Sequence, residues 1–166
     1  PCIRAFPHLS ELQAEHADDL QIVGVNIWDR KKNRQTGEYT ESMPDLISRV
    51  NEFTAEQGDK MGYTVAIEES DKMADNWMKP AGRNGIPSAF IVDNKGKVAW
   101  IGHPMQIDEP LEQVMAGEWD YEAAATEYTQ GLEEGYWYRH LMGLLTDEAT
   151  AERGYELGYA LLRTPL

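Results

Sequence analysis

The chain has 166 residues, enough for one ordinary domain with an appendage, and its 42% apolar and 27% charged residues are typical of a globular protein. Its formal net charge of −14 argues against nucleic acid or an anionic membrane as a partner, because both require a basic face. No apolar run approaches the ~20 residues of a membrane-spanning helix. The single cysteine, Cys2, excludes a disulfide within the chain, and a lone thiol is most often a small buried apolar residue.

The first two thirds of the chain alternate between helical and extended patterns. Residues 3–17 have apolar positions at helical spacing, and Pro7 is expected to bend this helix in its second turn. The run QIVGVNI predicts a buried strand over residues 21–27. After a polar loop, Ser42 is a plausible N-cap for a helix over residues 44–57. The further expected elements are a strand over 63–67, a short helix over 72–78, strands over 88–92 and 97–101, and a helix over 108–115.

The polar loop over residues 29–40 contains a basic run: Arg30, Lys31, Lys32 and Arg34. Such a run could be a docking patch, but a solvated loop is the commoner explanation. The four histidines offer no partners at the spacing of a metal site, so we interpret them as structural or surface residues and expect no metal.

The alternation predicts an α/β fold, in which helices flank a mixed sheet. The last two strands of this sheet form a hairpin around the turn Asp93–Gly96. The pattern changes around Gly117, and from Glu118 onward every apolar pattern is helical. We therefore expect a sheet domain over residues 1–117 and a helical extension over residues 118–166 that packs against it.

Three local features together resemble the thioredoxin superfamily over residues 1–117. Pro1-Cys2 opens a helix, and Pro7 follows the cysteine by five residues, like the second half of a Cys-x-Pro-Cys motif. The stretch Asn84-Gly85-Ile86-Pro87-Ser88 resembles the family's cis-proline loop, and AFIVDNKGKVAWIGHP resembles its strand pair. A helix-strand insertion over about residues 44–67 is similar to the TlpA-like, redoxin branch.

This resemblance implies a thiol-disulfide oxidoreductase that exchanges or reduces disulfides in other proteins. Cys2 would be the resolving cysteine of a Cys-x-x-Cys couple, at a helix N-terminus that stabilises thiolate. Ile86 and Pro87 would bind substrate, with a cis bond between them that lies close to Cys2. The partner would be a disulfide-containing or dithiol protein, no cofactor is implied, and the resemblance suggests an extracytoplasmic or periplasmic location.

The attacking cysteine of such a couple would lie two residues before Pro1. The strand leading into it would lie earlier still, between the strands at 21–27 and 88–92. We expect that the sequence is truncated and that the sheet domain lacks its first strand for this reason.

Two other functions remain open. One is a peroxiredoxin-like peroxidase, although a Pro-Cys pair followed by a proline-bent helix fits it poorly. The other is a non-catalytic thioredoxin-like module that holds a partner protein with the Ile86-Pro87 loop and the helical extension. Trp28 and Trp100 could line an active-site surface, but packing in the core or at its rim is the simpler explanation.

Overall fold

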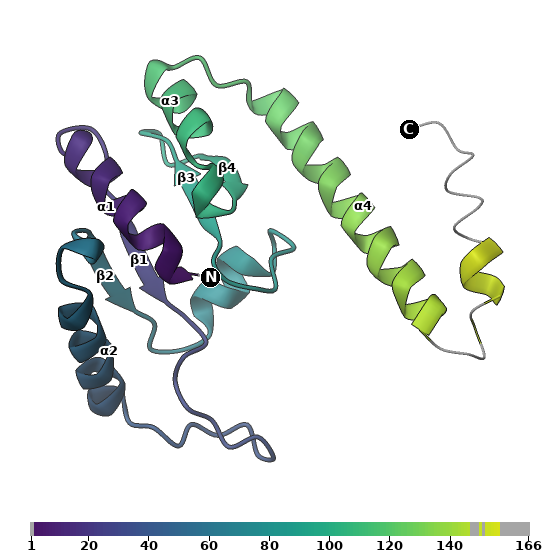
Figure 1. The fold of residues 1–166 in the computed structure, drawn as a ribbon, viewed down its shortest axis with the longest axis horizontal. Helices are drawn as coiled ribbons and strands as arrows, with labels where there is room; N and C mark the ends of the chain where they lie inside the picture. Colours follow the sequence, from purple (N-terminus) through teal and green to yellow (C-terminus); the bar gives the residue numbers. More distant parts are fainter. Residues whose placement is uncertain (1, 147–149, 151, 157–166) are drawn as a thin grey trace. The chain divides into compact units, whose positions relative to one another are not determined.

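The computed structural model of the protein describes residues 2–146, 150 and 152–156 (Figure 1). The chain divides into two compact units, Pro1–Gly117 and Glu118–Leu166. The first unit is mixed α/β and contains two small sheets. The apolar positions Leu157, Leu161 and Leu162, which predicted helix near the end of the chain, lie outside the described residues.

Two short sheets replace the single mixed sheet expected from the sequence. In one, β1 (Val23–Asn26) pairs in parallel with β2 (Thr64–Ile67). In the other, β3 (Ala89–Val92) pairs antiparallel with β4 (Val98–Gly102). No described strand pairs with both β1 and β3, so a single sheet does not form among the described strands. β1 and β3 are the two strands between which the sequence prediction placed the strand that it expected to be missing.

The N-terminal helix starts as a 3₁₀ turn, which its apolar periodicity does not indicate. A 3₁₀ turn, η1 (Cys2–Ala5), leads directly into α1 (Phe6–Glu15). Pro7 therefore lies in the first turn of α1, where a proline is tolerated because its missing N–H would have no helical partner. The predicted bend in the second turn is wrong, because the α-helix begins at Phe6, one residue before the proline.

The crossover between β1 and β2 is α2 (Met43–Gln57), which Figure 1 shows beside the β1–β2 pair. As predicted, Ser42 caps it, and its hydroxyl accepts a hydrogen bond from the N–H of Asp45 at 3.2 Å. Leu46 and Val50 point into the core from one face of the helix. The helix ends at Gly58, whose φ of 55° suits a residue without a side chain.

Two further helices of the first unit follow the sequence prediction with small shifts at their ends: the short π-helix η3 (Ala74–Met78) and α3 (Asp108–Ala116). The 3₁₀ turns η2 (Gly58–Met61) and η4 (Pro104–Gln106) were not predicted. The turn of the β3–β4 hairpin is held by Asp93, whose carboxylate accepts the N–H groups of Lys95 and Lys97.

The second unit contains one long helix, α4 (Tyr121–Thr146), and residues 152–156 are also helical. Asp120 caps the N-terminus of α4, because its side chain accepts hydrogen bonds from the N–H groups of Glu122 and Ala123, both at 3.0 Å. The packing of this unit against the first stays a prediction. Among the described residues, no helix is both long and apolar enough to cross a membrane.

Candidate functional site

Cys2 is the first residue of the N-terminal helical segment, and it is a free, half-buried thiol. It lies near Tyr63, the buried residue that precedes β2. Burial raises the pKa of Tyr63, and the negative charge of a nearby Cys2 thiolate raises this pKa further. The phenol and the thiol are thus electrostatically coupled, a relation between residues 61 positions apart that the sequence did not indicate.

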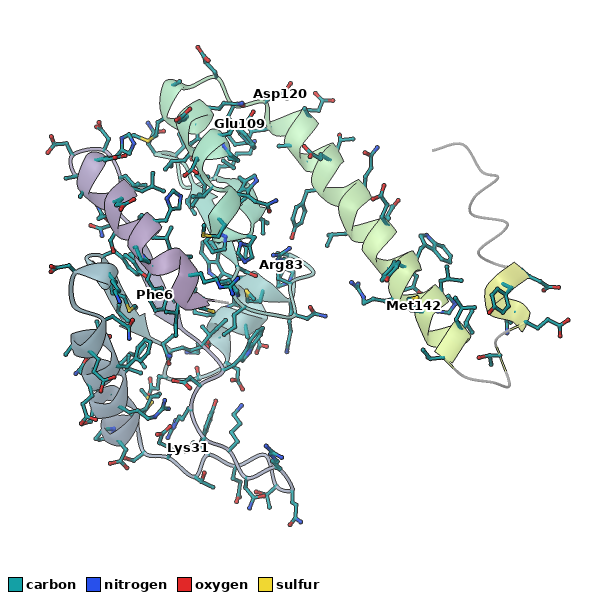
Figure 2. The ribbon with its side chains drawn as sticks, in the orientation of Figure 1. Phe6, Lys31, Arg83, Glu109, Asp120 and Met142 are labelled. Carbon is teal, nitrogen blue, oxygen red and sulfur yellow. The ribbon has the colours of Figure 1, made fainter. Side chains whose placement is uncertain are left out.

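Three contacts fix the helix that carries Cys2. The ring of Phe6, at the start of α1 in Figure 2, meets that of Phe53 on α2 edge to face at 6.2 Å. The hydroxyl of Ser10 donates to the carbonyl of Lys60 at 2.8 Å and accepts from the N–H of Gly62 at 2.9 Å. His8 Nε2 contacts Asp108 Oδ1 of α3 at 2.7 Å. The cysteine therefore sits at one end of a helix that is anchored to α2, η2 and α3.

The loop before β3 contains the other two predicted site residues. The peptide bond between Ile86 and Pro87 is cis, which confirms that part of the prediction. Hydrogen bonds hold the loop: Ser88 Oγ donates to the carbonyl of Gly85 at 2.9 Å and accepts from Nε of Arg83, a residue labelled in Figure 2, at 3.2 Å. The side chain of Ile86 is exposed. The proximity of this loop to Cys2, and the roles of the three residues, stay predictions.

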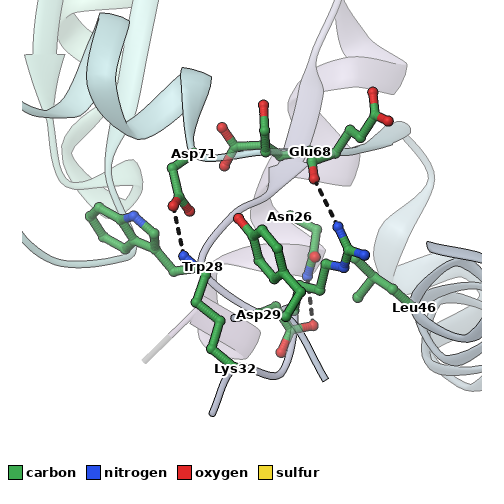
Figure 3. Close-up of a pocket in the computed structure, with 11 residues that line it drawn as sticks. Asn26, Trp28, Asp29, Lys32, Leu46, Glu68 and Asp71 are labelled. Carbon is green, nitrogen blue, oxygen red and sulfur yellow. Dashed lines mark hydrogen bonds and ion pairs between the residues drawn. The ribbon is translucent and has the colours of Figure 1, made fainter. Parts of the chain in front are cut away.

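A pocket of about 350 Å³ lies at the carboxyl ends of β1 and β2 (Figure 3). Its lining comes from the end of β1, the loop that follows it, Leu46 of α2, and residues 68–71 after β2. The carboxyl ends of parallel strands are where open α/β sheets commonly bind ligands. Sequence reasoning missed this site, although it noted both Trp28 and the basic run.

The loop after β1 is not simply solvated, because Glu41 and Arg49 anchor it to α2. Glu41 is buried, and its two carboxylate oxygens accept from Nε and Nη2 of Arg49, both at 3.0 Å. These hydrogen bonds hold the pKa of Glu41 below its usual value. Arg49 also bonds the side chain of Asp29 at 2.9 Å, and the N–H of Lys31 donates to Glu41 at 3.1 Å.

Tyr39 folds back over the basic run, and residues 32 and 39 pair as an isolated antiparallel bridge. The guanidinium of Arg30 lies 4.1 Å from the centre of the Tyr39 ring, and the ammonium of Lys32 lies 4.5 Å from it. Lys32 also pairs with Asp71 at 2.6 Å, which lowers the pKa of Asp71. Two cations of the run are thus engaged in the wall of the pocket rather than free in solvent.

The described residues contain no group of three or more histidine, cysteine, aspartate and glutamate side chains that could hold a metal ion. His103 caps η4 through Nδ1, which accepts from the N–H of Met105 at 3.2 Å. His8 joins α1 to α3. The ring of His140 stacks on that of Tyr136, with 6.1 Å between the ring centres. These three histidines thus have contacts within the fold.

Comparison with known proteins gives a distant similarity. No protein-family model matches the chain, and no solved structure matches it. The chain is similar to Protein FixW of Rhizobium leguminosarum, with 22% identity over 120 residues, which cover 71% of this chain and 51% of FixW. The chain therefore spans about half the length of the curated relative it matches.

These comparisons overturn the identification of the chain as a TlpA-like redoxin. No family model or solved structure supports that assignment, and the similarity to FixW suggests a thioredoxin-like redox protein at most. The short motifs around Cys2 and Pro87 are too few to establish a family. No specific activity follows from the comparison.

Proposed function

We propose that this chain is a thioredoxin-like protein that carries out thiol-disulfide exchange through Cys2. The observation that carries the proposal is the placement of Cys2: a half-buried thiol on the first residue of an anchored helix, next to the buried phenol of Tyr63. The distant similarity to FixW is consistent with a redox role. Unpaired N–H groups at a helix N-terminus favour a negative charge, and the thiolate is the reactive form of cysteine.

The exchange step needs one attacking thiolate and one disulfide. The thiolate of one partner attacks a sulfur of the other partner's disulfide, a new sulfur–sulfur bond forms, and the second sulfur leaves as a thiolate. With Cys2 as the only thiol of the described chain, the product is a mixed disulfide between Cys2 and one half of the substrate. A second thiol, which these 166 residues do not contain, then attacks the mixed disulfide and releases Cys2 as a thiolate.

The loop over residues 84–88 is proposed to hold the substrate during this step. Ile86 presents an exposed apolar side chain, and the hydrogen bonds of Ser88 and Arg83 fix the backbone on either side of it. An extended peptide could then lie along this loop with its disulfide toward Cys2. A substrate of this kind would be a protein, and an extracytoplasmic location for the reaction stays a prediction.

The test is formation of a mixed disulfide with a disulfide-bonded peptide. We expect the 166-residue chain to gain the mass of one half of the peptide, and we expect dithiothreitol to remove it. The variant Cys2→Ser should gain no mass, because its hydroxyl cannot attack a disulfide at neutral pH. Ile86→Ala should react more slowly with the peptide but at an unchanged rate with a small disulfide, which separates substrate binding from thiol chemistry.

Two outcomes would contradict the proposal. One is a Cys2 that stays unmodified in the folded protein with the peptide in excess. The other is a rate that Ile86→Ala lowers equally for the peptide and the small disulfide, which would remove the substrate role of the loop. The first outcome favours the non-catalytic binding module.

A further inference from the structure

We propose that the pocket at the carboxyl ends of β1 and β2 binds a small planar carboxylate, with Arg30 holding the carboxylate and the ring of Trp28 covering the planar body. This site is separate from the proposed thiol chemistry and does not depend on it. Its volume of about 350 Å³ falls in the range of pockets that take small molecules.

Arg30 is the cation of the pocket with donors left for a ligand. Its Nε donates to the carbonyl of Glu41 at 2.8 Å, and its Nη1 donates to the carbonyl of Glu69 at 3.3 Å. A guanidinium has five N–H donors, so these two bonds orient the side chain and leave other donors for a ligand. The Tyr39 ring at 4.1 Å covers one of its faces. In the described part of the chain, Arg30 pairs with no carboxylate.

Most carboxylates around the pocket already have partners. Asp29 accepts from Arg49 and Asn26, Asp71 accepts from Lys32, and Glu68 accepts from the N–H of Met73. Glu69 is exposed at the rim, where solvent screens its charge. Arg30 therefore meets little competition from within the pocket, and a carboxylate matches its planar fork with two parallel hydrogen bonds.

Trp28 supplies the apolar face of the site. It lies two residues after the end of β1, 44% of its surface is exposed, and its φ of 58° is unusual for a residue with a bulky side chain. Figure 3 shows its ring on the pocket wall beside the Lys32–Asp71 pair. The Tyr39 ring already contacts the cations of Arg30 and Lys32, so the Trp28 ring is the aromatic group of the pocket that can cover a planar ligand.

The test uses three probes on the full chain: benzoate, benzamidine and acetate. Benzamidine has the same ring as benzoate with the opposite charge, and acetate has the carboxylate without the ring. Isothermal titration should detect benzoate binding, with acetate at least about threefold weaker and no binding of benzamidine. In a ¹H–¹⁵N spectrum, benzoate should shift the indole N–H signal that disappears in Trp28→Asn.

Variants assign the binding to named residues. Arg30→Gln should weaken benzoate binding by about tenfold to a hundredfold, as expected for loss of a charged hydrogen-bond partner. Arg34→Gln removes an equal charge from the same basic run at a position that does not line the pocket, and it should leave binding unchanged. Trp28→Asn removes the ring, keeps a residue that tolerates positive φ, and should weaken binding by about threefold to tenfold.

Three results would overturn the proposal: no benzoate binding at millimolar concentration, equal binding of benzamidine, or an equal loss in Arg30→Gln and Arg34→Gln. Should Arg30→Gln lose its fold by circular dichroism, Trp28→Asn and the probe of opposite charge still decide the matter. Disulfide exchange by Cys2 should be the same in all these variants, so the two proposals can fail separately.

Discussion

The variant Leu46→Ala should lower the free energy of unfolding by about 2–5 kcal/mol, the range for removing a large apolar side chain from a core. Leu46 is 1% exposed and is the largest fully buried side chain among the described residues. It lies on the inner face of α2, the helix that connects β1 to β2 and anchors the loop of the pocket. Its loss leaves a cavity that the surrounding residues cannot fill.

The matched control is Ile47→Ala, the next residue on the same helix. Ile47 is 42% exposed, so its truncation removes a similar volume with little change in burial and should cost well under 1 kcal/mol. Urea denaturation followed by circular dichroism measures both values. Equal losses in the two variants would show that the inner face of α2 is not where the core lies.

Gly24→Ala should destabilise the protein by about 1–3 kcal/mol and disturb the surroundings of Cys2. A methyl group at Gly24 would lie 2.9 Å from Cε2 of Tyr63, closer than such atoms approach in folded proteins. The ring must therefore shift from its present position beside β1. Because burial and Cys2 together raise the pKa of Tyr63, this movement should lower its pKa toward the usual value.

The consequence for pH follows from the direction of that shift. A tyrosine whose pKa is raised by folding contributes stability that is full below its unfolded pKa and is lost as the pH rises through the raised, folded pKa. The alkaline loss of stability that Tyr63 causes should be smaller in Gly24→Ala. NMR titration of ¹³C-labelled tyrosine measures the pKa, and Gly85→Ala is the control because an added methyl group there meets no atom within 4 Å. An unchanged Tyr63 pKa in a destabilised Gly24→Ala would contradict the coupling.

Local elements of the fold were predictable because their signals are local. Ser42 caps α2 through the N–H of Asp45, three residues away, and the Asp93–Gly96 turn is held by Asp93 itself. Such hydrogen bonds need only neighbouring residues, so they can be predicted from a short stretch of sequence. The position of Pro7 in the first turn of α1 was missed, because apolar spacing continues unchanged across the junction from 3₁₀ to α-helix.

Strand pairing and the pocket depend on contacts between distant segments. Nothing in the β1 sequence states that it pairs with β2 alone, and nothing in the basic run states that Tyr39 folds back onto Arg30. One signal could have indicated the fold-back: the side chain of Asn33 accepts the N–H groups of Gln35 and Thr36, a turn that Gly37 completes. The pairing of Lys32 with Asp71 joins residues 39 positions apart and had no sequence signal.

The predicted site was only partly accessible to sequence reasoning for the same reason. Cys2 at a helix start and Ile86-Pro87 before a strand are visible as short motifs, and the structure places Cys2 and the Ile86-Pro87 bond in those local settings. Tyr63 became part of the surroundings of Cys2 only through the fold. Short motifs describe local geometry well, whereas the assignment to the TlpA-like redoxins that they suggested did not hold.

If folding makes Cys2 a reactive thiol, its rate of reaction with a small aromatic disulfide should show it. The rate is measured at one pH for the native chain and for the chain unfolded in urea, by release of the coloured thiol. We expect a faster reaction in the native protein, because unpaired N–H groups at a helix N-terminus favour a negative charge and the thiol is only half-buried. A native rate well below the unfolded rate would show that Cys2 is a shielded structural residue and that the proposed thiol chemistry is wrong.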